Sequence, residues 1–428
     1  MADVIEMEGA QAQRRAAAER RAEEVTRVRR LMRHPRNAVE EGEDGIPHWV
    51  RPPKPSLQNA EIVFREDAWF RDRLAFNAFT EQVEWDGHDL ADHDLTEVRL
   101  AAAHGYDLQL SAALCFDALT YTARLDAMRY HPVVDYLDGL VWDGRPRLDN
   151  LLTDYAGAEP TDLASMLGAR FAMAACARVI SPGAKVDTVL VLVGPQGIGK
   201  STWLRTLAGD AWFRDTALDL RSKDAFVGLR GAWIYEMAEL AAVRPRDAET
   251  VKAFLSAQVD HYRPPYARAL ISQPRQCVFA GTTNEATFLT DPTGARRFWP
   301  VTIANAPDLE RTEADRDQLW AEAAERVKAG ARWWLEAEES AALVKAHEDH
   351  QHEDPWSEPI AMWAQERGDE PFSIREVLEG ALTMPRDRAT RGHEMRIGPL
   401  LRALGFSRSR RQAGGQRVYL WSRGGFDA

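Results

Sequence analysis

The segment Gly194–Ser201, with the sequence GPQGIGKS, combines residues that together can hold a phosphate chain. It fills every fixed position of the pattern G-x-x-x-x-G-K-[ST], after the apolar stretch Thr188–Val193 and before Thr202–Leu207, which can continue as a helix. The glycines let backbone N–H groups point at phosphate oxygens, and the helix N-terminus adds positive partial charge. Lys200 would then reach the β- and γ-phosphates of ATP, and the Ser201 hydroxyl would ligate Mg²⁺. The predicted nucleotide-binding residues are Gly194, Pro195, Gln196, Gly197, Ile198, Gly199, Lys200, Ser201 and Thr202.

Two glutamates lie at or after the end of the next apolar stretch, 231–237: Glu236 is near its end and Glu239 comes three residues later. Hydrolysis of a nucleoside triphosphate needs one carboxylate that holds Mg²⁺ through water and one group that polarises the attacking water. We assign the metal to Glu236 and the water to Glu239. Because the two acids are separated rather than adjacent, the reverse assignment stays open.

One amide and two guanidinium groups complete the candidate site. Asn284 follows the apolar stretch 276–283, where a short amide can bond the γ-phosphate or the attacking water. Its alternative role is to form a turn. Arg296 and Arg297 follow a Pro/Gly turn and precede the strand-like sequence FWPV. A guanidinium near the γ-phosphate stabilises the transition state, but a structural arginine pair bonded to acids of the sheet fits the spacing equally well.

These side chains can meet only if the apolar stretches lie side by side. Strands are expected at 188–193, 231–237 and 276–283. A helix ending at Ser181 precedes the first strand, and helical patterns at 202–207 and 247–259 separate the strands. Strands that alternate with helices form a parallel sheet, with the ligand at the carboxyl ends of the strands. We therefore predict an α/β ATPase core of the P-loop class.

The rest of the chain divides by composition. Residues 1–46 are a charged leader, either a solvated helix or poorly ordered. Prolines between 47 and 55 mark a linker, and 47–155 is expected to form a mixed α+β N-terminal domain. The ATPase domain is assigned to 156–348 and a third domain to 359–428, with a polar linker between them.

Composition limits the environment of the chain. Among 428 residues, no apolar run reaches the roughly 18 needed to span a membrane, and the charged start lacks the pattern of a secretory signal. The three cysteines are far apart and form no zinc or disulfide pattern. We therefore expect a cytoplasmic protein without a membrane partner. Because the net charge is −12, any nucleic-acid site must be local.

The C-terminal domain provides such a local site. Its sequence reads as helix, helix, turn and strand, the order of a winged helix with its wing at Gly414-Gly415. Residues 386–423 contain ten arginines against two acids, a net of +8. We expect phosphate-backbone contacts here from Arg408, Arg410 and Arg411. The alternative is that this basic surface docks on the acidic ATPase domain.

Several segments in this order resemble the virulence-associated E (VapE/VirE-type) family of phage- and island-encoded ATPases, related to superfamily 3 helicases and to AAA+ machines. The resemblance covers roughly 130–305 and rests on HPVVDYLDGLVWDGRPRL, PGAKVDTVLVLVGPQGIGKST, WIYEMAEL, KAFLSAQVDHYRPPYAR, QCVFAGTTNE and FLTDPTGARRFWPV. It implies that GPQGIGKS is Walker A, that Glu236 and Glu239 belong to Walker B, and that Asn284 is a sensor. It also implies that Arg297, or its neighbour Arg296, is an arginine finger given to the next subunit of a ring of six subunits.

The resemblance further implies a DNA-contacting segment from Lys252 through Tyr262 and Arg263 to Tyr266, lining the central channel around single-stranded DNA. Cations that meet phosphates and aromatics that stack on bases suit that task. Family members often carry a primase domain ahead of the helicase, and we find none here, so a separate primase or replication protein is expected. The implied function is an ATP-dependent DNA helicase or translocase in replication of a phage or mobile element. The alternative is an ATP-switched DNA-binding regulator or loader that does not unwind.

Overall fold

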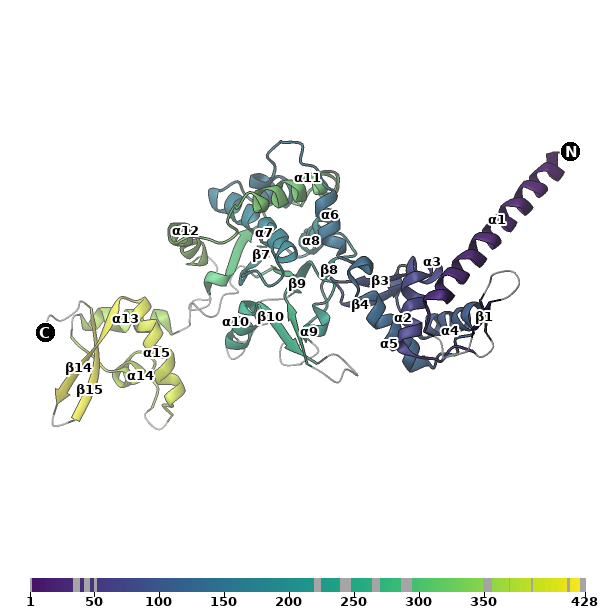
Figure 1. The fold of residues 1–428 in the computed structure, drawn as a ribbon. Helices are drawn as coiled ribbons and strands as arrows, with labels where there is room; N and C mark the ends of the chain where they lie inside the picture. Colours follow the sequence, from purple (N-terminus) through teal and green to yellow (C-terminus); the bar gives the residue numbers. More distant parts are fainter. Residues whose placement is uncertain are drawn as a thin grey trace. The chain divides into compact units, whose positions relative to one another are not determined.

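The computed structural model places the chain in two compact units (Figure 1). The first comprises residues 1–286 and 293–346, and the second comprises 287–292 and 347–428. The structure describes residues 2–33, 39–41, 47–49, 52–218, 225–238, 248–263, 270–285, 295–348, 356–368, 370–385, 388–413 and 416–423.

The first unit begins with a helical module built on a small sheet. Its helices are α1 (Ala2–Leu31), α2 (Leu57–Glu66), α3 (Ala68–Arg71), α4 (Asp92–Tyr106) and α5 (Ala112–Ala123). The sheet has the order β5-β4-β3-β6, in which β3 and β6 run parallel and the other neighbours antiparallel. Its strands are β3 (Leu74–Asn77), β4 (Gln82–Trp85), β5 (His88–Asp89) and β6 (Arg129–Tyr130). A separate antiparallel pair joins β1 (Val39–Glu41) to β2 (Pro47–Trp49).

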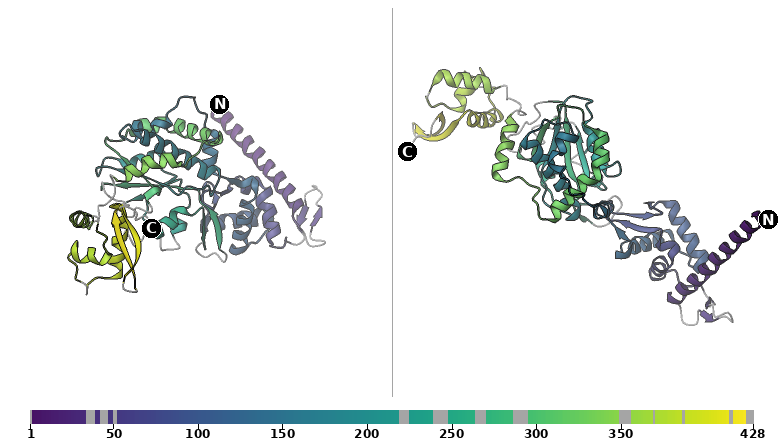
Figure 2. Two further views of the ribbon diagram at one scale, coloured as in Figure 1. Left: turned by 90° about the vertical axis from the view of Figure 1, so that its left-hand side faces the viewer. Right: turned by 90° about the horizontal axis from the view of Figure 1, so that it is seen from above.

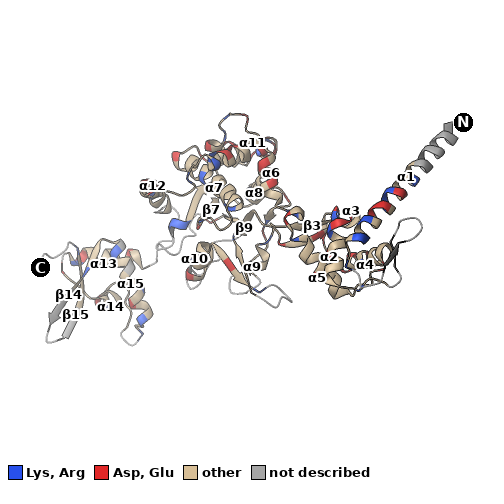
Figure 3. Ribbon diagram, viewed as in Figure 1, with Lys and Arg blue, Asp and Glu red and all other residues tan. Residues whose placement is uncertain are grey.

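The second half of α1 is part of this module. Acidic and basic residues alternate along its described part, as on a solvated helix (Figure 3), but Val28 and Met32 are buried in the module's core. The fully buried carboxylate of Asp67 accepts hydrogen bonds from the Arg21 guanidinium and from the Tyr106 hydroxyl (2.6 Å). A buried carboxylate requires such partners. The expected leader, 1–46, therefore contains a helix that packs into the core that follows it.

Five parallel strands form the central sheet of the first unit, in the order β13-β7-β12-β9-β8. The sheet lies in the teal and green part of the ribbon (Figure 2). Their bounds are β7 (Val189–Val193), β8 (Phe213–Arg214), β9 (Ile234–Ala238), β12 (Val278–Thr283) and β13 (Phe298–Thr302). β7 and β12 are buried along their whole length, in keeping with the near-continuous apolar sequences of parallel strands. The predicted mixed α/β fold with a parallel sheet is confirmed. The short edge strand β8 lies between the expected helix 202–207 and the expected strand 231–237, where no strand was predicted.

Helices share the core of this sheet. They are α6 (Pro132–Gly139), α7 (Asp162–Ile180), α8 (Lys200–Ala208), α11 (Leu309–Lys328) and α12 (Ala337–Glu348). The rings of Trp233, just before β9, and Trp320 on α11 lie 4.1 Å apart, and each indole N–H donates to a backbone carbonyl at 2.9 Å. Among the described residues, α7 is the one helix long and apolar enough to span a membrane, but 72% of its apolar window is buried inside the protein. α7 is therefore packed as a core helix.

A smaller layer precedes β12. It contains α9 (Ala225–Gly228), α10 (Ala248–Ser256) and an antiparallel hairpin of β10 (Val259–Tyr262) and β11 (Ile271–Pro274). The guanidinium of Arg275, just after β11, forms a buried ion pair with Asp260 on β10, with Nε donating at 3.0 Å. Because both charges are buried, each depends on the other for its stability.

The second unit has its own core. It contains α13 (Ser357–Arg367), α14 (Ile374–Gly380), α15 (Arg391–Ala403) and the antiparallel strands β14 (Phe406–Ala413) and β15 (Gln416–Arg423). Ser373 and Thr390 begin α14 and α15 with capping boxes. The order of two helices followed by a strand agrees with the sequence expectation, and α13 and the paired strand β15 complete the unit. The expected wing tip, Gly414-Gly415, lies outside the described residues.

Candidate functional site

The glycine-rich loop joins β7 to α8 at the carboxyl edge of the central sheet. Gly197 (φ 79°) and Gly199 (φ 107°) are in the left-handed region that other residues avoid. Gly194 donates its N–H to the carbonyl of Thr283 on β12 (3.1 Å), and a Cβ on Gly194 would lie 2.8 Å from the carbonyl oxygen of Ile303. Gly197 and Gly199 are therefore needed for their backbone conformation, and Gly194 is needed because a side chain would not fit there.

Lys200 is the first residue of α8, and its ammonium group bonds to the loop. Its Nζ donates to the carbonyl oxygens of Gly194 (2.8 Å) and Pro195 (2.9 Å), and the residue is only 8% exposed. Burial lowers the pKa of the Lys200 ammonium, while the carboxylate of Glu236 acts in the opposite direction. The Lys200 ammonium group is therefore held against the start of the glycine-rich loop, at Gly194 and Pro195.

Glu236 connects three elements of the site. Its Oε1 accepts hydrogen bonds from the hydroxyls of Ser201 on α8 (2.7 Å) and Thr282 on β12 (2.5 Å), and the residue is 2% exposed. In the parallel pairing of β9 with β12, Glu236 lies beside Ala280. Thr282 is two residues after Ala280, so it lies on the same face of the sheet as Glu236. A carboxylate beside a serine hydroxyl is a hard oxygen donor set that suits Mg²⁺. The residues assigned to the metal, Ser201 and Glu236, are thus in contact.

Thr282 is a candidate that the sequence analysis missed. Its hydroxyl donates a shorter hydrogen bond to the Glu236 carboxylate (2.5 Å) than the Ser201 hydroxyl does (2.7 Å). A signal was available, because Thr282 is two residues before Asn284 and alternate residues of a strand share a face. Asn284 itself is exposed directly after β12, next to the strand end that bonds Gly194. Glu239 lies outside the described residues, so its predicted role is neither supported nor opposed by geometry.

The two arginines lie at the other edge of the sheet. A 3₁₀ turn, Ala295–Arg297, precedes β13, whose first residue Phe298 pairs with Val189 at the start of β7. Arg297 Nε donates to Ser256 Oγ (3.2 Å) and lies 3.9 Å from Asp187 Oδ2. Arg296 is exposed. Within one chain, therefore, neither arginine lies near Lys200. The contacts of Arg297 with Ser256 and Asp187 agree with the alternative that it is a structural residue.

The residues expected to line a DNA channel have different surroundings. Tyr262 is 2% exposed, and its hydroxyl accepts a hydrogen bond from Arg230 Nε (2.6 Å). The ring of Tyr262 therefore packs inside the protein in this structure, and its predicted stacking on a base stays a prediction. Lys252, on α10, pairs with Glu249 (2.9 Å). Arg263 is exposed just after β10, and Tyr266 lies outside the described residues.

The predicted C-terminal DNA contacts are all on β14. Arg408 is exposed, with its guanidinium 3.8 Å from the centre of the Tyr419 ring on β15. Arg410 pairs in register with Tyr419, and Arg411 pairs with Val418. The surroundings of the Arg410 and Arg411 side chains lie outside the description.

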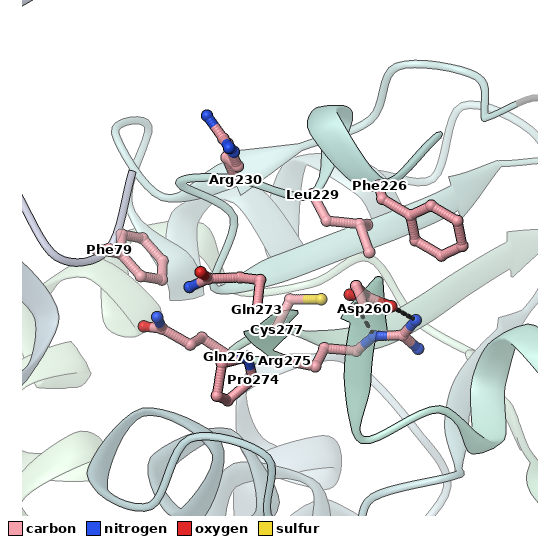
Figure 4. A pocket seen from close by; sticks show the side chains of 10 residues that line it. All are labelled: Phe79, Phe226, Leu229, Arg230, Asp260, Gln273, Pro274, Arg275, Gln276 and Cys277. Carbon is pink, nitrogen blue, oxygen red and sulfur yellow. Dashed lines mark hydrogen bonds and ion pairs between the residues drawn. The ribbon is translucent and has the colours of Figure 1, made fainter. Parts of the chain in front are cut away.

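A cavity lies at the amino end of β12, away from the glycine-rich loop (Figure 4). The ion pair of Arg275 and Asp260 lines it, together with Phe79, Phe226 and Cys277. Its volume of about 20 Å³ accommodates about one water molecule. Burial raises the pKa of the Cys277 thiol to about 11, so this cysteine is a poor nucleophile at neutral pH. The cavity is therefore a feature of packing at the base of the β10–β11 hairpin.

A family model described as "Virulence-associated protein E-like domain" matches residues 137–352. The Hemin import ATP-binding protein HmuV of Rhodococcus jostii (strain RHA1) is 37% identical over 91 residues, which are 21% of this chain and 30% of that protein. The chain thus matches less than a third of that relative's length. Two solved structures of the NrS-1 C terminal region are each 12% identical, with TM-scores of 0.44 and 0.45. Each match covers 82% of this chain and 96% of the other.

Proposed function

Because this chain belongs to the virulence-associated protein E-like family, we propose that it is a Mg²⁺-dependent ATPase that moves along or unwinds DNA during replication of a phage or mobile element. The observation that carries the ATPase assignment is the cluster of Lys200, Ser201, Glu236 and Thr282 around the loop that follows β7. The 91-residue similarity to a protein named for ATP binding adds weak support. In this proposal the segment 194–201 is a P-loop, or Walker A motif.

The chain's own residues define the steps at this site. Lys200 exchanges its hydrogen bonds to two loop carbonyls for hydrogen bonds to β- and γ-phosphate oxygens. The bonds to phosphate are stronger, because both partners are charged and the site is partly desolvated. Mg²⁺, when bound, neutralises charge on the phosphates, and Ser201 with Glu236 would hold it. Thr282 keeps the Glu236 carboxylate oriented through its hydrogen bond. Asn284 and Glu239 stay candidates for positioning the attacking water.

DNA contact and assembly are further parts of the proposal. Arg263 is exposed next to the β10–β11 hairpin and is suited to the phosphate backbone. The second unit, with two capped helices and an arginine-bearing ribbon, is proposed to bind DNA as a winged-helix-like module. A ring of six subunits would bring Arg297 or Arg296 of one subunit to the loop of the next. Priming would come from a separate protein.

The test compares ATP hydrolysis by the full chain with and without single-stranded DNA, for the wild type and for Lys200→Ala. We expect hydrolysis that DNA stimulates in the wild type and that Lys200→Ala abolishes, with an unchanged melting temperature in the absence of nucleotide. Near-normal turnover in Lys200→Ala would refute the P-loop assignment.

A strand-displacement assay then separates the two functional readings. DNA-stimulated hydrolysis with displacement supports the motor, and DNA binding without displacement supports an ATP-switched regulator or loader.

A further inference from the structure

Two histidines and an aspartate meet in the N-terminal module, outside the candidate nucleotide site. His88 lies on β5, while His93 and Asp94 lie in the first turn of α4. Nε2 of His93 is 3.2 Å and Nε2 of His88 is 3.8 Å from the same atom, Asp94 Oδ1. One ligand atom from each residue lies within 4.8 Å of the others. In the described part of the chain, this is the one group of such side chains with the spacing of a metal site.

The aspartate is held in place by the backbone. Asp94 is 2% exposed, and its Oδ2 accepts a hydrogen bond from the N–H of Ala91 (2.7 Å). Because Oδ2 is engaged in this helix cap, Oδ1 is the oxygen that faces both imidazoles. A ligating carboxylate whose second oxygen bonds a backbone donor is oriented as metal sites require.

The distances suit a small ion with tetrahedral geometry. Zinc bonds to nitrogen and oxygen are about 2.0–2.1 Å long, which places tetrahedral ligand atoms about 3.4 Å apart. The two observed separations, 3.2 and 3.8 Å, lie on either side of this value. The side chains of His88 and His93 are 53% and 78% exposed, so their rings can turn toward an ion without a change in the backbone. That exposure also leaves the fourth position open to solvent.

The local charge favours a cation. Asp89 on β5 and Asp92 at the start of α4 are both exposed and lie one residue from the two histidines in sequence. Such acids raise the local concentration of cations. Imidazole ligands select ions of the zinc, nickel and copper type over Mg²⁺ or Ca²⁺, which prefer oxygen.

We propose that His88, His93 and Asp94 bind one divalent transition-metal ion, with zinc as the best match. The ion would link β5 to the start of α4 and leave a coordination position for water or for a side chain of a partner. The proposal does not depend on the ATPase assignment, because none of these residues contributes to the loop that follows β7.

The experiment uses the full chain after removal of metals by a chelator. Zinc chloride is titrated by calorimetry in buffer that contains Mg²⁺ and no nucleotide, and Co²⁺ is used as a spectroscopic substitute whose visible absorption reports tetrahedral coordination. We expect one zinc ion per chain. His88→Ala, His93→Ala and Asp94→Asn should each weaken binding at least about tenfold and remove the Co²⁺ band.

His104→Ala is the matched control, because His104 is an exposed histidine in the last turn of the same helix. It should leave zinc affinity unchanged. Since His88 and His93 are exposed, their alanine variants should keep the metal-free melting temperature of the wild type. The absence of saturable zinc binding would overturn the proposal. So would binding that survives both histidine substitutions, or binding that His104→Ala weakens equally.

Discussion

Arg297→Ala distinguishes a purely structural arginine from one that acts on the ATP of a neighbouring subunit. Arg297 precedes β13, and the glycine-rich loop starts six residues further along the paired strands, at the level of Ile303 and Gly194. At about 3.3 Å per residue, this separation is about 20 Å. An arginine side chain cannot span that distance, so any role of Arg297 in hydrolysis must be exerted on another subunit.

The two readings differ in magnitude. As a structural residue, Arg297 donates one hydrogen bond to Ser256 and lies 3.9 Å from Asp187. Losing these contacts should cost about 1–2 kcal/mol of folding stability. As a finger, Arg297 should contribute about 10³–10⁵ to the rate of hydrolysis. We expect Arg297→Ala to bind ATP with nearly unchanged affinity, to melt a few degrees lower, and to lose hydrolysis by at least three orders of magnitude.

Mixing two inactive variants provides the decisive assay. Lys200→Ala keeps its arginines, and Arg297→Ala keeps its loop, so an interface is complete where a Lys200→Ala subunit faces an Arg297→Ala subunit in the right order. In randomly mixed rings at equal amounts, about one quarter of the head-to-tail interfaces have this arrangement. Hydrolysis should then return to about a quarter of the wild-type rate if the sites act independently.

Two results would refute this reasoning. Arg297→Ala that hydrolyses ATP normally would leave only the structural role. Mixed rings that form, as shown by co-purification of tagged subunits, but stay inactive at every ratio would argue against action between subunits. Arg296→Ala is the neighbouring control and identifies which of the two arginines carries the effect.

Three further predictions concern other parts of the molecule. Glu236→Gln keeps the shape of the buried side chain but removes its charge, so hydrolysis should fall about 10²-fold or more while the melting temperature changes little. Glu325→Gln, at an exposed position on α11, should change neither. Burial lowers the pKa of His131, which also bonds Gln276 (2.6 Å). The unfolded chain therefore takes up the proton first, and the free energy of unfolding should fall as pH drops below about 6.5. Denaturant unfolding between pH 5 and 7 should show a flatter profile for His131→Gln. Neutralising the three arginines predicted on β14 should reduce the slope of log K for DNA against log salt by about two to three units, and an unchanged slope by fluorescence anisotropy would contradict these contacts.

Local chemistry made the glycine-rich loop predictable from sequence. Gly197, Gly199, Lys200 and Ser201 belong to one consecutive pattern whose conformation is set by the residues themselves, and the structure places the first two at positive φ. Glu236 was assigned to the metal because it ends an apolar stretch, and its carboxylate does meet Ser201. Their contact follows from the order of parallel strands rather than from spacing along the chain.

Contacts between distant segments account for what was missed. The contact of Thr282 with Glu236 depends on the register of β12 with β9. Tyr262 was expected to face DNA because aromatic residues stack on bases, but Arg230, from a segment 32 residues earlier, holds its hydroxyl inside the protein. The exposure of a residue in a hairpin depends on which face of the hairpin packs against the rest of the protein, and a single sequence does not specify that face.

The anchoring of α1 has a consequence for how the chain is made. Arg21 and Val28 leave the ribosome before the groups that they pack against, Asp67 and the core around Tyr106, have been synthesised. A long polar helix has little apolar surface of its own, so its stability in the chain depends on that docking. During synthesis α1 therefore cannot dock until Asp67 and then Tyr106, which lie 46 and 85 residues after Arg21, have been added to the chain. Its docking, rather than its formation, marks the completion of the first module.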